Sequence, residues 1–133
     1  MAFLALKKIT QSVIIIILFF CMSQIIRANA MDTKHDIYKI FPSRNLDESQ
    51  KLGYIKPLYN DTQFIHLATY DQIDKIVAKY WADELNLLIA KIDPVKITGE
   101  LVYETNPGGT NKYYHLYNGK IPLDAIMEIY LYK

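Results

Sequence analysis

The sequence predicts an α+β fold: a compact single domain of short strands and two main helices over residues 31–133. Three observations support this prediction. Short apolar or alternating runs recur between clusters of turn residues, which is typical of strands. One stretch, from Thr69 to Trp81, carries apolar residues at helical spacing. No repeat, low-complexity tract or linker divides the sequence, and about a hundred residues are enough to bury one core.

The first thirty residues predict a secretory signal peptide. Lys7 and Lys8 form a basic start, residues 13–22 are an uninterrupted apolar run, and residues 28–30 (Ala-Asn-Ala) match a small-x-small cleavage site. We expect cleavage after position 30, export to the periplasm or the medium, and no membrane contact afterwards. An uncleaved membrane anchor over residues 9–26 is the alternative.

Without that segment the chain is weakly acidic and has no cysteine. Its removal takes away three of the 15 basic residues, none of the 14 acidic residues, and the single cysteine, Cys21. The domain therefore depends on its core rather than on disulfides. The absence of a basic cluster argues against a nucleic-acid partner, which would need a positive face.

The first half of the mature sequence predicts a strand, a short helix and a loop. Residues 36–41 alternate in polarity and are followed by a proline, which ends a strand. Either Ser43 or Asn45 begins the helix, and Asn45 with Glu48 resembles a capping box. The glycine at position 53 is typical of a helix C-terminus, and the residues after it are predicted to form a loop.

A second strand at residues 63–67 leads into the most regular helix of the sequence. Thr69 and Gln72 predict a capping box at its start. The apolar residues that follow recur at helical spacing and form a single stripe: Ile73, Ile76, Val77, Tyr80 and Trp81.

Four further strands are predicted in the second half, at residues 87–92, 101–105, 113–117 and 125–132. The first of these is almost wholly apolar and predicts a buried strand. The last alternates, which predicts a closing strand with one solvated face. Asn118-Gly119 gives a strong turn signal between the last two strands.

The sequence lacks the common motifs for cofactor binding and covalent catalysis. It has no phosphate-binding glycine loop, no paired cysteines and no two histidines at metal-ligand spacing, so no metal site is predicted. Ser43 and Ser49 fall on the short helix, which we expect at the surface, and this disfavours a serine nucleophile.

Three polar features are candidates for a binding or catalytic site. His66 interrupts an apolar strand and is either a half-buried, hydrogen-bonded side chain or an acid–base group in a cleft. Glu104 precedes a glycine turn and is either a solvated strand residue or a functional carboxylate. His115 and Tyr117 project to one side of an aromatic strand, where packing and recognition are both open. Eleven tyrosines favour an aromatic, hydrogen-bonding groove.

Several ordered segments together resemble a known family. These segments are Ile37-Tyr38-Lys39-Ile40, Phe64-Ile65-His66-Leu67-Ala68-Thr69 with Asp71-Gln72, Tyr103-Glu104, and His115-Leu116-Tyr117 with Pro122-Leu123. In order and spacing they resemble the bacterial domain-of-unknown-function family 952 over residues 36–129. The sequence departs from that family at Gln63 and Ala68, where the family usually has glycine and serine.

The resemblance implies a split, curved mixed sheet around a nucleotide-sized cleft, similar to ADP-ribosyltransferases. It implies NAD or an ADP-ribose-like group as the ligand. The residues that it assigns to ligand binding are His66, His115, Tyr117, Thr69 and Lys39, the last as a phosphate contact. It assigns Glu104 and His66 to catalysis.

The first strand has Tyr38-Lys39 where NAD-using transferases have a Tyr-His-Gly-Thr-like segment or an arginine, so catalysis stays open. The alternative function is a non-enzymatic envelope or secreted module that binds another protein.

Overall fold

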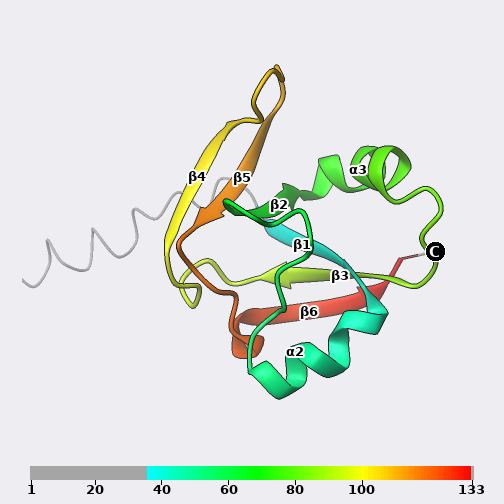
Figure 1. The fold of residues 1–133 in the computed structure, drawn as a ribbon, viewed down its shortest axis with the longest axis vertical. Helices are drawn as coiled ribbons and strands as arrows, with labels where there is room; N and C mark the ends of the chain where they lie inside the picture. Colours follow the sequence, from blue (N-terminus) through cyan, green and yellow to red (C-terminus); the bar gives the residue numbers. More distant parts are fainter. Residues whose placement is uncertain (1–35, 133) are drawn as a thin grey trace, which may run out of the picture. The chain divides into compact units, whose positions relative to one another are not determined.

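A computed structural model describes residues 36–132; the predicted signal peptide at residues 1–30 lies outside the described residues. The described residues form an α+β fold, an open six-stranded antiparallel sheet with two α-helices (Figure 1). The strands are β1 (Ile37–Pro42), β2 (Ile65–Thr69), β3 (Leu87–Ile92), β4 (Glu100–Thr105), β5 (Lys112–Tyr117) and β6 (Ile126–Leu131), and the helices are α2 (Leu46–Leu52) and α3 (Ile73–Tyr80). None of the helices in this range is long and apolar enough to cross a membrane.

The sheet has the strand order β4-β5-β2-β1-β3-β6, and every pair of neighbours is antiparallel. The prediction of a mixed sheet is therefore wrong. The physical reason lies in the crossover through α3, which links β2 to β3. These two strands run in the same direction, but β1 lies between them and runs opposite to both.

The sheet opens between its two central strands. β1 pairs with β2 at only two positions, Ile37 with Thr69 and Tyr38 with Ala68, whereas it pairs with β3 at six positions. Beyond Tyr38 the two strands diverge. This split places a gap in the middle of the sheet, and the candidate site described below surrounds it.

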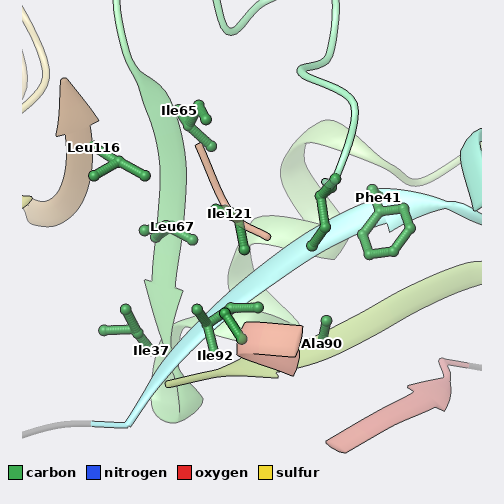
Figure 2. Close-up of a cluster of buried hydrophobic side chains, with 10 residues drawn as sticks. Ile37, Phe41, Ile65, Leu67, Ala90, Ile92, Leu116 and Ile121 are labelled. Atoms are coloured by element: carbon green, nitrogen blue, oxygen red, sulfur yellow. The ribbon is translucent and has the colours of Figure 1, made fainter. Parts of the chain in front are cut away.

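Strand alternation distributes the core over both faces of the sheet. On one face the largest cluster joins residues from β1, β2, β3 and β5 to Ile55 and Ile121 in the loops. Figure 2 shows its strand residues together with Ile121. On the other face α3 covers a second cluster through Ile73. The buried members of this second cluster are Tyr38, Ile40, Ile73, Leu87 and Ile89.

The predicted helix after β2 is confirmed, together with its cap. A 3₁₀ turn at Tyr70–Gln72 precedes α3, and the Gln72 Oε1 atom accepts a hydrogen bond from the Thr69 backbone N–H at 3.0 Å. The strand before it is shifted, because β2 begins at Ile65 and ends at Thr69. Thr69 thus ends the strand and caps the helix, with no loop between the two elements.

Of the two caps predicted for the first helix, the N-terminal cap at Asn45 is wrong and the C-terminal glycine, Gly53, is confirmed. Asn45 has helical backbone angles and makes no side-chain cap hydrogen bond, since a 3₁₀ turn at Ser43–Asn45 runs directly into α2. Gly53 ends the helix in the left-handed conformation, with φ of +77°.

Ser49 was predicted to lie at the surface, and this prediction is wrong. It is fully buried, its hydroxyl donates to the Asn45 carbonyl at 2.8 Å, and its Oγ accepts from the Lys56 N–H at 2.9 Å. These two bonds tie α2 to the loop that follows it, so the role of Ser49 is structural.

The last strand differs from the prediction of one solvated face. β6 is an edge strand, and all of its residues after Ile126 are exposed on both faces. Its large exposed side chains are Met127, Ile129, Tyr130 and Leu131.

Candidate functional site

A buried ion pair fills the split between β1 and β2. The Lys39 Nζ atom lies 2.7 Å from Asp61 Oδ2, and the two side chains are 2% and 0% exposed. Lys39 Nζ also donates to the His66 carbonyl at 3.2 Å, and the His66 N–H donates to Asp61 Oδ1 at 3.0 Å. In a regular ladder these two groups of His66 would pair with β1. The ion pair therefore takes the place of the missing backbone hydrogen bonds.

Asp61 is the centre of this cluster. Its carboxylate also accepts hydrogen bonds from the Leu58 N–H at 2.9 Å and from the His66 ring Nδ1 at 2.9 Å. Burial by itself raises the pKa of Asp61. The hydrogen bonds from His66 and the charge of Lys39 outweigh burial and hold this pKa well below its usual range. Burial lowers the pKa of Lys39, against the opposing effect of the Asp61 charge.

This contact fixes the protonation pattern of the His66 ring. An ionised carboxylate only accepts hydrogen bonds, so Nδ1 of His66 carries the proton that points to Asp61. In the neutral ring Nε2 then keeps a lone pair and acts as an acceptor or base. The His66 side chain is 38% exposed while Asp61 is fully buried, so a ligand can reach the imidazole but not the carboxylate.

A cavity of about 150 Å³ borders this cluster. It lies where the β1–β2 split meets α3 and the turn between β4 and β5. Its aromatic walls come from Tyr38, Tyr80, Trp81 and Tyr113, and its polar lining comes from Lys39, Asn60, Asp61, His66 and Asn106. A cavity of this volume accommodates one benzene-sized ring.

A second polar cluster lies on β4 and β5. Oε1 of Glu104 accepts from the Tyr117 hydroxyl at 2.5 Å and contacts His115 Nδ1 at 3.0 Å. The hydrogen bonds from Tyr117 and His115 lower the pKa of Glu104, and the bond to Glu104 raises the pKa of Tyr117. Phe64 stacks on the buried His115 ring at 3.9 Å between centroids.

The two clusters are neighbours. His66 and His115 are directly opposite each other on β2 and β5, with ring centroids 5.6 Å apart. The structure thus brings together His66, His115, Tyr117 and Glu104, as the sequence suggested. Of these four residues, only His66 lines the 150 Å³ cavity.

The other two predicted ligand-binding residues already have partners within the protein. The ammonium of Lys39 is bound to Asp61, so a phosphate contact would have to compete with that carboxylate. The hydroxyl of Thr69 donates to Asp71 at 2.6 Å at the start of α3. In the range 36–132, no group of three or more His, Cys, Asp or Glu residues is placed to hold a metal ion.

Sequence reasoning did not identify Asp61 or Asn106 as site residues. The available signal for Asp61 was Lys39, a lysine in an otherwise apolar strand, because a buried cation needs an acidic partner. The sequence does not tell which acid supplies it, since Asp61 lies 22 positions away in an irregular loop. No sequence feature marks Asn106 as a site residue; it is simply the first residue of a predicted turn.

Comparison with known proteins shows the family and the fold. The chain belongs to the family described as "Protein of unknown function (DUF952)", whose profile matches residues 40–129. Two crystal structures, one of them of a double mutant, and a solution NMR structure of protein CC0527 from Caulobacter crescentus are similar to it at 24% sequence identity. They cover 71% of this chain and 82% to 83% of the CC0527 chain, with TM-scores of 0.60 to 0.62. No curated protein matches the chain.

Proposed function

Starting from this family membership and the geometry of the cavity, we propose that the domain binds a small ring-bearing ligand beside His66. NAD, entering with its nicotinamide ring, is the first candidate. The observation that carries the proposal is the ring-sized cavity next to the buried Lys39–Asp61 pair and the oriented His66 ring. Aromatic walls around a few fixed polar groups are typical of small-molecule sites.

The volume of the cavity limits what it holds. About 150 Å³ accommodates one ring and not a whole dinucleotide. The remainder of NAD would therefore lie outside the cavity. Glu104 and Tyr117, on the two strands beyond His66, would then contact the ribose, with Glu104 as the carboxylate that faces it; the buried His115 supports this pair from within.

The split sheet and the neighbouring histidines support a fold similar to that of ADP-ribosyltransferases. This likeness is part of the proposal, and fold likeness alone does not carry an activity. We propose binding and leave turnover open. We also propose that the domain works after export, as the residues at positions 1–30 predict.

Thermal unfolding of the purified protein with NAD, nicotinamide or ADP-ribose tests the proposal. A ligand at a hundred times its dissociation constant adds about 2.7 kcal/mol of stability. We expect NAD and nicotinamide to raise the melting temperature of the wild type but not of His66→Ala. Gln63→Ala, an exposed change just before the same strand, serves as the control and should keep the shift. The absence of a shift with all three ligands in folded wild-type protein would contradict the proposal.

A second candidate function is protein binding through the β6 edge. Within residues 36–132 no strand pairs with its outer edge, and its apolar side chains Met127, Ile129 and Leu131 are exposed. An extended segment of another polypeptide can pair with such an edge.

A further inference from the structure

We infer that the cavity selects its ligand by hydrogen-bond direction: it takes a ring that carries an N–H or O–H donor, such as a carboxamide, and rejects the corresponding carboxylate. This inference rests on the proposed function, because it assumes that the cavity binds a ring. It goes further by naming the chemical class of the substituent on that ring, which the volume of the cavity does not determine.

The first acceptor is His66. Its Nδ1–H is committed to Asp61 at 2.9 Å, so in the neutral ring the other nitrogen presents a lone pair. The Asp61 side chain is fully buried and the His66 side chain is 38% exposed. A ligand that hydrogen-bonds to the neutral His66 ring is therefore left with the accepting nitrogen, because the donating one is bound to Asp61.

The second acceptor is Asn106, which lines the same cavity. Among the described residues, its Oδ1 atom is one of two buried side-chain atoms without a hydrogen-bond partner. A buried acceptor that lacks a donor destabilises the folded state. A ligand donor that reached this oxygen would form the missing hydrogen bond, and the binding free energy would then include the recovery of that bond.

Among the described residues, the cavity lining also has no lysine or arginine without an acidic partner, so a carboxylate would lose its hydration without gaining an unpaired cation. Of the lysines and arginines in the described range, only Lys39 lines the cavity, and its ammonium is bound to Asp61 and to the His66 carbonyl. The pair is neutral overall, and Asp61 is closed off from solvent. The hydroxyls of Tyr38, Tyr80 and Tyr113 donate as well as accept, so they do not discriminate. A carboxylate has two acceptor oxygens and no donor, so it could not hydrogen-bond to the accepting atoms of His66 and Asn106.

Benzamide and benzoate form a matched pair of probes for this inference. They share the ring and a planar substituent, and they differ in the N–H donors and in charge. We expect benzamide to titrate the purified protein in NMR spectra at pH 8 with a dissociation constant at least about tenfold lower than that of benzoate. Asn106→Ala should weaken benzamide binding by about three- to tenfold and narrow the difference between the two probes. Asn111→Ala, on the same hairpin but outside the cavity, should leave both unchanged.

The outcomes separate the inference from the proposed function. Benzoate binding as tightly as benzamide overturns the donor rule and leaves the ring site standing. If neither probe saturates any resonance, the ring site itself is overturned. If Asn106→Ala prefers benzamide over benzoate by the same factor as the wild type, Asn106 does not contact the ligand, and this part of the inference is overturned. The comparison of the two probes on wild-type protein requires no variant to fold.

Discussion

Lys39 and Asp61 substitute for backbone pairing at the point where β1 leaves β2. One ammonium and one carboxylate satisfy the N–H and the C=O of His66, which the split would otherwise leave without partners. Two buried charges are a costly way to fill a gap, because their desolvation opposes their attraction. Here the carboxylate also orients a third group, the His66 ring.

The first prediction concerns the loss of either charge. Lys39→Met and Asp61→Asn should each lower the free energy of unfolding by about 3–5 kcal/mol, because each leaves the other charge buried and unpaired or weakly paired. Urea denaturation measures this. The double variant should lose much less than the sum of the two single variants, since no charge is then left without a partner. Strictly additive losses would contradict the ion pair.

The second prediction concerns acid. The pKa of Asp61 is lower in the folded state than the value of about 3.9 in an unfolded chain. Its contribution to stability is therefore complete above about pH 4 and is lost as the pH falls through the folded-state pKa. The stability difference between wild type and Asp61→Asn, measured by urea denaturation, should be constant from pH 7 to pH 5 and shrink below pH 4. A difference that stays the same down to pH 2.5 would contradict this account.

At the scale of elements, two glycines hold the end of β5 against the chain before β4. A Cβ atom on Gly119 would lie 1.8 Å from the Thr98 carbonyl oxygen, and one on Gly99 would lie 2.3 Å from the Tyr117 carbonyl oxygen. No side chain fits at either position. This close backbone contact sets where the β4–β5 hairpin begins, and the hairpin carries Glu104, Asn106 and His115.

The third prediction tests this contact. Gly119→Ala should lower the free energy of unfolding by about 3 kcal/mol or more, because backbone must move to admit the methyl group. Gly53→Ala is the matched control, since its Cβ meets open space and only the left-handed φ is unfavourable, which costs about 1–2 kcal/mol. Equal losses for the two variants in chemical denaturation would contradict the packing argument.

The elements themselves were largely predictable from local pattern. Each of the six strands was predicted from alternation or apolar runs, and α3 from its apolar stripe and its Thr69 cap. The Asn45 cap failed because the residues before α2 already turn as a 3₁₀ helix, so that no extended residue precedes the helix. The local sequence does not show whether Asn45 becomes an extended cap or part of a 3₁₀ turn.

At the scale of the whole domain, the sequence predicted that four polar residues lie together, but not the cavity beside them. His66, His115, Tyr117 and Glu104 were predicted as site residues and do lie together. The cavity could not be predicted, because its lining comes from six separate segments whose contact depends on where β1 and β2 diverge. The exposure of β6 also depends on strand order, which alternation does not reveal.

The fourth prediction concerns the β6 edge. A second copy of this chain is the simplest extended partner, and antiparallel pairing centred on Ile129 would place Met127 opposite Leu131 and Glu128 opposite Tyr130. Self-association should then appear in sedimentation velocity at high protein concentration and be reduced by Ile129→Lys, which charges the edge. Glu128→Lys, which leaves the apolar face intact, is the control. A monomer at all concentrations would mean that this edge does not bind a second copy.

The most direct test of the account is whether the cavity itself holds the ring. Ala68 is buried, lines the cavity and lies opposite Tyr38 on β1, so Ala68→Leu should fill the space while Ala68→Ser keeps it open. We predict saturable nicotinamide binding in NMR titrations of the wild type and Ala68→Ser, and none in folded Ala68→Leu. Equal binding by all three proteins, or no binding by the wild type, would contradict the central claim.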